Sequence, residues 1–508
     1  MSDSITIANK EKPSSLKSVI IKNLVPIIIA IILFAVAFFL RTWRISSSPD
    51  IFSDEILYAD IAIKLPKYGF LMAYGLPWFV HPPLYFLLQS AYFQLAGIGS
   101  VTLSNVFSAR LTSALFSSLT ILFVFFFITK ISDYRIGTFS ALVLMFEPYA
   151  LKYARIGILD SALVLFIIVS FYIFTEANNT KDVKKFVLSG VLFGLALITK
   201  ELALSLLVIL AVWYLLTRFV TRNNISTKGI LIFLANGFLI YLIYVAWALS
   251  IDAQIFIATN LSLMERSLWI VSNTGYTSPN NISFLSDFLS TTSIYLVSYL
   301  ILALALVSCF YLLYKNKNKT EVFLTSWFIG SVIFFAAMGI HNPQFFVYLT
   351  VPASVVTGFT LSKIGLRIPQ RKKIISYGAL LLLFLIIFYN LGVWMVVDNG
   401  TDNSVSQSVA WVQGNIPKGQ TIYVDNSDFS YLLSNYNIKV SDSNTSKNTL
   451  DSIKGQNIHY FIFTTKLKYE LNLDLLTFVQ TKGTIIASFS GRSLGQTDIY
   501  YVPNANHA

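Results

Sequence analysis

Residues 136–174 read IGTFSALVLMFEPYALKYARIGILDSALVLFIIVSFYIF, and the length of this stretch decides how the chain is folded. As one helix it would be about 60 Å long, at about 1.5 Å per residue. That is about twice the hydrocarbon thickness of a membrane, which is roughly 30 Å. The polar side chains Lys152, Arg155 and Asp160 lie near its middle. The stretch therefore predicts two membrane-spanning helices joined by a polar hairpin tip.

The composition of the whole chain agrees with a polytopic membrane protein. Of its 508 residues, 55% are hydrophobic and only 12% are charged, whereas soluble globular chains carry about 25% charged residues. The net charge of +12 comes from short basic clusters between apolar runs, a pattern typical of cytoplasmic loops rather than of nucleic-acid binding. Cys309 is the only cysteine, so intrachain disulfides and cysteine-based metal sites are excluded.

About eleven apolar runs are expected to span the membrane. The first is longer than the core of a signal peptide and is expected to be retained. Residues 186–216 would form a helix of about 46 Å with Lys200 and Glu201 at its centre, so a hairpin of two short spans is favoured over one tilted helix. The expected spans are residues 19–40, 104–128, 136–151, 159–174, 186–198, 202–216, 230–249, 294–313, 322–340, 345–361 and 374–396.

Basic clusters set the expected orientation of these spans. The clusters occupy alternate loops, at residues 10–22, 130–135, 181–185, 218–228, 315–319 and 363–373. All of them can be cytoplasmic only if the number of spans is odd and residues 81–96 form a surface helix rather than a crossing. We therefore expect a multi-pass protein of the cell membrane with a cytoplasmic N-terminus and an extracytoplasmic C-terminus.

The expected fold is an all-α polytopic membrane domain, residues 1–397, followed by a small α/β extracytoplasmic domain, residues 398–508. The first outer loop, residues 41–103, contains two amphipathic patterns, at 54–68 and 82–96, that predict helices lying on the membrane surface. A second polar outer loop is expected at 251–289. In the C-terminal domain, residues 421–425, 459–464, 484–489 and 498–502 have the pattern of strands, with helical patterns between them.

Asp54 and Glu55 are adjacent carboxylates at the start of the first surface helix. Near a helix N-terminus such residues are favoured by the helix dipole and often only cap the helix. A carboxylate that faces a cavity at the membrane surface can instead take a proton from an attacking hydroxyl group. Asp54 is the first candidate for such a general base, and Glu55 is the second.

Other ionisable residues gather on the same expected side, and a set of costly charges at one membrane face indicates a functional site. Each has a structural alternative. His81 can cap the helix that follows Pro82, Arg155 can pair with Asp160, and Lys200 can form an ion pair within its own hairpin tip. In the functional interpretation, Arg155 and Lys200 bind a phosphate group, and Asp160 orients Arg155 or a sugar hydroxyl. His341 lies in a further short loop on this side.

Four motifs occur in order at the ends of the predicted spans: Phe52-Ser53-Asp54-Glu55, His81-Pro82-Pro83-Leu84, ARIGILDS at residues 154–161 and GLALITK at residues 194–200. In this order they resemble the protein O-mannosyltransferase family and its relatives among the C-type glycosyltransferases, which include aminoarabinose transferases. The segment from His341 to Tyr348 is similar to a later outer loop of that family. The motifs that carry the resemblance lie in the first two hundred residues. The remainder of the chain resembles the family only in its topology.

This resemblance implies the C-type glycosyltransferase fold, a polyprenyl-phosphate-linked sugar donor, and transfer on the outer face with inversion at the anomeric carbon. It implies that the catalytic carboxylate is Asp54 or Glu55. It also implies donor-binding positions at His81, Arg155, Asp160, Lys200, His341 and Tyr348. No cofactor or metal is expected, because phosphate is a good leaving group.

Two departures from the family leave the acceptor open. The loop at 251–289 is too short for the β-trefoil domain of the eukaryotic enzymes. In addition, Tyr85 and Phe86 follow the Pro-Pro-Leu motif, where those enzymes have Gly-Lys.

We therefore predict a membrane hexosyltransferase that moves mannose or another hexose from a polyprenyl-phosphate donor to a hydroxyl of a protein, glycan or lipid acceptor. The bilayer is an expected partner and nucleic acid is not. A polytopic transporter or flippase is the alternative, although such proteins place polar residues at the bilayer midplane. A scaffold with a partner-binding outer domain would leave the motifs at Asp54 and Arg155 unexplained. An oligosaccharyltransferase is disfavoured, because no Trp-Trp-Asp-type motif lies near the C-terminal domain.

The orientation can be tested with single cysteines in a Cys309→Ser background. Cysteines placed at Lys185 and Lys317 should react only with reagents that reach the cytoplasm, and a cysteine near the C-terminus should react from outside. The reason is that basic loops are retained on the cytoplasmic side. Cytoplasmic labelling of the C-terminal cysteine would contradict the whole scheme.

Overall fold

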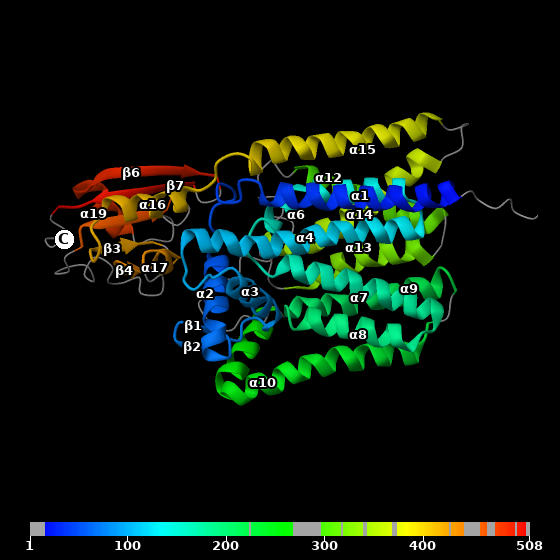
Figure 1. The fold of residues 1–508 in the computed structure, drawn as a ribbon, viewed down its shortest axis with the longest axis horizontal. Coiled ribbons are helices and arrows are strands. Elements are labelled where there is room, and N and C mark those ends of the chain that lie inside the picture. The colour runs from blue at the N-terminus through cyan, green and yellow to red at the C-terminus, as the bar shows by residue number, and fades with distance from the viewer. Residues whose placement is uncertain are drawn as a thin grey trace, which may run out of the picture.

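The protein consists of an elongated bundle of helices with a smaller strand-containing domain at one end (Figure 1). The computed structural model describes residues 16–222, 225–267, 296–315, 319–338, 343–367, 373–425, 428–440, 458–464, 473–492 and 495–503. The predicted fold class, a helical membrane domain followed by a small α/β domain, is confirmed.

Each of the eleven expected spans coincides with a helix of the bundle. Eight helical stretches of the described residues are long and apolar enough to cross a membrane, one of them being α9 together with the turn before it (residues 201–219). Helices α5 and α8 and the apolar part of α13 (residues 321–337) are shorter. The bundle is made of α1 (Leu16–Thr42), α4 (Leu103–Ile131), α5 (Tyr134–Met145), α7 (Asp160–Thr180), α8 (Val183–Leu197), α9 (Ser205–Phe219), α10 (Thr227–Ser267), α12 (Leu296–Lys315), α13 (Lys319–Ala337), α14 (Val347–Arg367) and α15 (Lys373–Val393).

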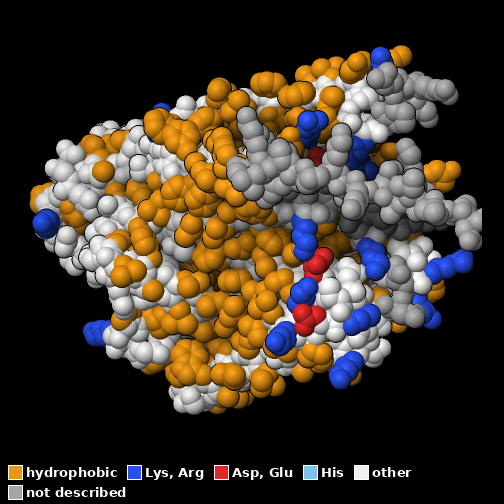
Figure 2. All heavy atoms as spheres, turned by 45° about the vertical axis from the view of Figure 1, so that its right-hand side comes forward, with side chains coloured by type: hydrophobic (Ala, Val, Ile, Leu, Met, Phe, Trp, Pro, Cys, Tyr) orange, Lys and Arg blue, Asp and Glu red, His pale blue; other side chains and the backbone are white. Residues whose placement is uncertain are grey.

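The surface of the bundle is apolar along its length and basic at one end. Figure 2 shows a broad field of apolar side chains that gives way to Lys and Arg side chains at the end farthest from the strands. Exposed residues such as Ile31, Leu242 and Phe388 contribute to the apolar field. We call the far end the basic end. It comprises the last turns of α4, α7 and α9 and the first turn of α13, which begins at Lys319.

The stretch that first indicated a hairpin is broken at two points. Helix α5 ends at Met145, and a short helix, α6 (Pro148–Ala154), follows before α7. A span from 136 to 151 was expected, but Pro148 has no backbone N–H and disfavours helical geometry in the residue before it. The Glu147 side chain then caps α6 by accepting from the Ala150 backbone N–H at 2.6 Å. The second predicted hairpin, between α8 and α9, is confirmed, with a 3₁₀ turn η1 (Glu201–Leu204) at its tip.

Helix α14 occupies the centre of the bundle. Of the 18 most apolar consecutive residues of α14, 94% are buried inside the protein, whereas the share for α15 is 33%. A helix that is apolar around its whole circumference is stable only inside a larger structure. A 3₁₀ turn, η3 (Pro343–Phe346), leads into α14 and carries its first residues toward the end of the bundle that meets the C-terminal domain.

Two helices lie between the bundle and the C-terminal domain, as predicted for the first outer loop (Figure 1). They are α2 (Ser53–Tyr68) and α3 (Leu84–Leu95), separated by a small hairpin of β1 (Met72–Ala73) and β2 (Leu76–Pro77). Helix α2 ends at Gly69, whose φ of 75° closes the helix in the left-handed conformation. We call this end of the bundle the site end.

The second outer loop differs from the expectation. Helix α10 continues past the predicted end of its span and bends at Asp252, where the backbone is not helical. The Asp252 carboxylate caps the second part of the helix by accepting from Ile255 N at 2.9 Å. Residues 253–267 are therefore helical, and the rest of the predicted loop lies outside the described residues.

The C-terminal domain is a five-stranded mixed sheet with helices beside it. The strands lie in the order β4-β3-β5-β7-β6; β4, β3 and β5 are parallel, whereas β7 and β6 are antiparallel to their neighbours. Strand β4 was not predicted. The elements are α16 (Ser404–Asn415), β3 (Thr421–Val424), α17 (Asp428–Leu432), β4 (Asn437–Val440), β5 (Tyr460–Thr464), α19 (Leu473–Lys482), β6 (Thr484–Gly491) and β7 (Gly495–Tyr501).

A buried ion pair joins α2 to α4. The Arg110 guanidinium contacts both carboxylate oxygens of Glu55, at 2.5 and 2.8 Å, and neither side chain is exposed. Arg110 also donates to the carbonyls of Ile45, Pro49 and Asp50. The pair therefore fixes both the start of α2 and the chain that leads into it.

Replacing Arg110 with Met should leave the Glu55 carboxylate buried without its partner. Loss of one member of a buried pair costs about 3–5 kcal/mol, so the thermal unfolding midpoint in detergent should fall by several degrees. Arg367→Met is the matched control, because Arg367 pairs with Asp133 at the exposed surface, where ion pairs contribute little. An Arg110→Met protein as stable as the Arg367→Met control would contradict this account.

Candidate active site

Five of the predicted site residues converge at the site end, although they come from distant parts of the sequence. They are Asp54 in the first turn of α2, His81 before α3, Asp160 at the start of α7, Lys200 before η1, and Tyr348 in the first turn of α14. In Figure 1 the start of α7 and the end of α8, which precedes Lys200, lie at the end of the bundle beside α2 and α3.

Asp160, Lys200 and Tyr348 form one buried group. The Lys200 ammonium lies 2.8 and 3.1 Å from the two Asp160 carboxylate oxygens. The Tyr348 hydroxyl donates to Asp160 at 2.6 Å, and the ammonium also lies 4.7 Å from the Phe345 ring centre. The sequence left open two ion pairs within single hairpin tips, Arg155 with Asp160 and Lys200 with Glu201. The structure instead pairs Asp160 with Lys200. This pair joins the two hairpin tips.

Asp54 lies beside this group and is partly buried. Burial is the main reason why the pKa of the Asp54 carboxyl is raised above its ordinary value of 3.8, while the positive charges of His81 and Lys200 act in the opposite direction. A hydrogen bond with Gln344 also favours the charged form, and the Tyr58 hydroxyl lies 3.5 Å from the carboxylate. A carboxyl group whose pKa is raised by burial and lowered by neighbouring groups can accept and release a proton near a bound molecule.

His81 is held in an aromatic setting. Its ring lies edge-on to Trp78, with centroids 5.6 Å apart, and to Tyr58, with centroids 5.9 Å apart. On its other side, Nδ1 is 3.7 Å from a carboxylate oxygen of Glu201. A hydrogen bond of 2.9 Å from Leu84 N to Ile198 O fixes the loop after His81 against the end of α8. These contacts place the imidazole beside Asp54 rather than as a cap of α3.

Glu55 points away from this group. Besides Arg110, its carboxylate accepts from the backbone N–H groups of Phe52 at 3.0 Å and Gly157 at 2.9 Å. Four hydrogen bonds within the protein thus satisfy the carboxylate, and the side chain is fully buried. Glu55 therefore positions the start of α2 against α4 and the loop before α7.

Arg155 is also fully buried, and its guanidinium contacts protein carbonyls. It donates to Leu40 O at 2.6 Å, Trp43 O at 2.9 Å and Ser48 O at 2.8 Å. Two of these carbonyls belong to the end of α1 and the turn after it, where a positive charge is favoured by the helix dipole. These contacts tie the guanidinium to the backbone between α1 and α2, and its predicted phosphate binding stays a prediction.

Two residues that contact Asp54 were not singled out in the sequence, Tyr58 and Gln344. Only the position of Tyr58, one helical turn after Asp54, was a signal for its place. Glu201 was named only beside Lys200, and the structure places its carboxylate 3.7 Å from His81. His341 lies outside the described residues. Within the described residues, no group of three His, Cys, Asp or Glu side chains is arranged to hold a metal ion; the expectation of a metal-free reaction stays a prediction.

Comparisons with known proteins agree with the motif order. Residues 80–248 match the family described as dolichyl-phosphate-mannose-protein mannosyltransferase. ArnT from Cupriavidus metallidurans, solved bound to undecaprenyl phosphate, is similar to this chain with a TM-score of 0.56 and 14% identity, covering 97% of this chain and 99% of ArnT. No curated protein sequence gives a significant match.

A second solved structure is similar over much of its length. The oligosaccharyltransferase AglB from Archaeoglobus fulgidus, in complex with an inhibitory peptide and a dolichol-phosphate, has a TM-score of 0.58 and 13% identity, covering 88% of this chain and 70% of AglB. The structural matches confirm the fold of the C-type glycosyltransferases. Together with the family match, they confirm the predicted resemblance and the predicted class of enzyme, a membrane glycosyltransferase.

Proposed function

We propose that this membrane glycosyltransferase moves a hexose from a polyprenyl-phosphate donor to a hydroxyl group of an acceptor, in the space beside Asp54. The observation that carries the proposal is the meeting of Asp54 with His81 and the Asp160–Lys200 pair at one end of an apolar bundle. The family match extends over residues 80–248, which include His81, Asp160 and Lys200. The polyprenyl phosphates bound to ArnT and AglB support the donor class.

In the proposed reaction, the Asp54 carboxylate takes the proton of the acceptor hydroxyl. The oxygen attacks the anomeric carbon of the sugar from the side opposite to the phosphate, and a new C–O bond forms. The bond between that carbon and the phosphate oxygen breaks, and the polyprenyl phosphate leaves with the electron pair. The configuration at the anomeric carbon is inverted, and Asp54 later returns its proton to water.

The charge of the leaving phosphate requires a positive group. We assign this role to Lys200 with the help of His81, because both side chains lie across the same space from Asp54 and favour its charged form. Asp160 and Tyr348 position the Lys200 side chain. Arg155 has a different role in this proposal: it holds the backbone between α1 and α2, and so sets where Asp54 lies.

We take mannose as the first sugar to test, since the matched family is described as mannosyltransferases. The acceptor is a hydroxyl of a protein, a glycan or a lipid. We place the reaction at the outer face of the cell membrane, because the site end lies opposite to the basic end (Figure 1) and basic loops favour the cytoplasm.

Asp54→Asn should lower turnover by roughly 10²–10⁴-fold, the usual contribution of general acid–base catalysis. The amide keeps the shape of the side chain, so donor binding should change little. Purified protein can be assayed for transfer of radiolabel from polyprenyl-phosphate mannose to candidate acceptors. Glu55→Gln is the neighbouring control and should act first on stability, because Glu55 is paired with Arg110. Near wild-type turnover by Asp54→Asn would rule out this base.

The pH dependence of transfer should report the environment of Asp54. The carboxyl must be ionised to accept a proton, so kcat/KM should fall as the pH drops through its pKa, which burial raises above 3.8. Lys200 lowers this pKa, so Lys200→Met should move the acidic limb to higher pH as well as slowing the reaction. Lys64→Met removes a cation that pairs with Asp60 on α2 and should leave the limb in place. An unmoved limb in Lys200→Met would contradict the assignment.

A further inference from the structure

Buried polar atoms without partners lie beside the candidate active site, around the residue that follows Lys200. Glu201 begins η1, the turn between α8 and α9. One of its carboxylate oxygens, Oε1, is buried and has no hydrogen-bond partner within the described residues. Nδ1 of His81 and the hydroxyl of Tyr244, on α10, are likewise buried and form no hydrogen bond with any part of the chain that the structure describes. The proposed reaction gives Glu201 and Tyr244 no role.

Glu201 lies near both of the other two groups. Nδ1 of His81 is 3.7 Å from Oε2 of Glu201, which is longer than a hydrogen bond. The Glu201 carboxylate also interacts electrostatically with the hydroxyls of Tyr241 and Tyr244. It is therefore close to the Tyr244 hydroxyl, yet these two groups form no direct hydrogen bond. A small polar group between them would satisfy both.

The bend in α10 holds Tyr244 in this position. The side chain is only 5% exposed, and its ring lies edge-on to Phe256, with centroids 6.0 Å apart. Phe256 follows the bend at Asp252 and in turn lies edge-on to Phe79, with centroids 5.4 Å apart. Phe79 is two residues before His81. The bent helix is thus packed against the loop that carries His81, and it runs beside α8, which leads to η1 (Figure 1).

The chemistry of these atoms restricts what they can bind. Buried polar groups in folded proteins are nearly always hydrogen-bonded, so neighbouring buried atoms without partners indicate a bound molecule. A carboxylate only accepts hydrogen bonds, so the molecule must present a donor, whereas the phosphate of a polyprenyl-phosphate sugar has none. A sugar hydroxyl can donate to Glu201 and accept from Tyr244 at the same time.

The position of Lys200 relates these atoms to the proposed donor. The Lys200 ammonium pairs with Asp160 at 2.8 Å and is assigned to the donor phosphate, whereas the carboxylate of the next residue, Glu201, faces His81. The sugar of the donor is bonded directly to that phosphate. Two neighbouring side chains can therefore contact the two parts of one donor, the cation its phosphate and the carboxylate its sugar.

We propose that Glu201, Tyr244 and His81 form the subsite that recognises the hydroxyl groups of the transferred sugar. This inference rests on the proposed function and adds the class of sugar. Glu201 accepts from a hydroxyl that also accepts from Tyr244, and Nδ1 of His81 contacts the same sugar. The sugar is a neutral hexose, because the negative charge of Glu201 would repel a sugar that carries a carboxylate.

The test measures the affinity of the purified full-length chain in a neutral detergent for polyprenyl-phosphate mannose and for a series of donors that each lack one mannose hydroxyl. Wild type should bind one member of the series about tenfold more weakly than the intact donor, as expected for a hydrogen bond to a charged group. Glu201→Gln should bind the intact donor about tenfold more weakly and should distinguish it from that member by at most about twofold.

Tyr244→Phe should weaken binding of the intact donor by roughly two- to tenfold, since it removes an uncharged hydrogen bond. Both substitutions keep the shape of the side chain. Neither should change the affinity for polyprenyl phosphate, which has no sugar, and retained binding of this lipid shows that a variant is folded.

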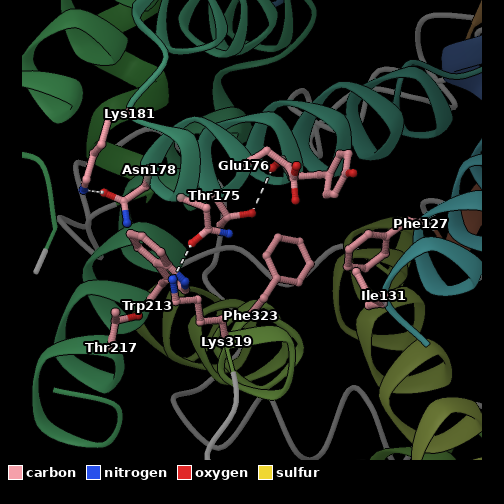
Figure 3. A pocket seen from close by; sticks show the side chains of 12 residues that line it. Phe127, Ile131, Thr175, Glu176, Asn178, Lys181, Trp213, Thr217, Lys319 and Phe323 are labelled. Atoms are coloured by element: carbon pink, nitrogen blue, oxygen red, sulfur yellow. Dashed lines mark hydrogen bonds between the residues drawn. The ribbon is translucent and has the colours of Figure 1, made fainter. Parts of the chain in front are cut away.

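Glu176→Gln is the matched control for the carboxylate. Figure 3 shows Glu176 at a pocket in the basic end, and its carboxylate is paired with Lys130 at 3.1 Å. Glu176 follows Asp160 on α7 by 16 residues, a distance of about 24 Å along a helix. Tyr314→Phe is the control for the hydroxyl, because Tyr314 is 88% exposed near the end of α12. Both controls should bind every lipid like wild type.

Several results would overturn the subsite. Unchanged affinity for the intact donor in both Glu201→Gln and Tyr244→Phe would show that these side chains do not contact the sugar. An equal loss of affinity for polyprenyl phosphate would show that they act on the phosphate instead. Tighter binding of a polyprenyl-phosphate hexuronate or amino sugar than of the mannose donor would overturn the neutral class.

The same measurements separate the subsite from the proposed function. If the expected affinities are found but no transfer to any acceptor occurs, the proposed reaction is contradicted and the subsite stands. If transfer occurs and the affinities of Glu201→Gln and Tyr244→Phe equal that of wild type, the reaction stands and the subsite is wrong. Wild-type protein that binds neither the donor nor polyprenyl phosphate would overturn both.

Discussion

The buried contact between Glu55 and Arg110 is the interaction on which the arrangement of the site depends. It joins the start of α2 to the middle of a membrane helix, and the remaining donors of Arg110 hold the chain that enters α2. Successive residues of a helix point about 100° apart. When Glu55 is fixed against α4, Asp54 is turned toward Lys200 and His81. Two adjacent carboxylates of one motif thus have separate roles, one in position and one in the proposed chemistry.

The segment before α7 divides its roles in a similar way. Arg155 binds three carbonyls around the end of α1, and Gly157 N donates to Glu55. Three residues later, Asp160 pairs with Lys200 at the end of another hairpin. One short motif therefore holds the backbone beneath α2 and also sets the cation that faces Asp54. A substitution in this motif acts on several contacts at once, so its effects on stability and on catalysis must be measured separately.

Much of the fold could be predicted because its causes are local. Apolar runs set the bundle helices, Pro82 and Pro83 mark the start of α3, and the polar tips mark the hairpins. The partners of charged residues could not be predicted in this way. Arg110 lies inside an expected span, where a charge at membrane depth is a signal in its own right, yet the sequence does not show that Glu55 is its partner. Arg155 and Asp160 are close in sequence but have separate partners, since pairing is decided by how the helices pack. Strand β4 is short and mostly exposed, so its pattern carries little signal.

The C-terminal domain shares a hydrophobic cluster with the helix that carries Asp54. Ile56 and Ala59 of α2 belong to the same cluster as Val405 and Val409 of α16, and Asp50 caps α16 by accepting from Val405 N across 355 residues of sequence. Helix α2 is therefore synthesised long before α16, its packing partner. Until α16 has been synthesised, the apolar face of α2 lacks this partner and is accessible to chaperones or to lipid. The site end is completed only when the last segment arrives, so the order of translation itself delays the assembly of this part of the molecule.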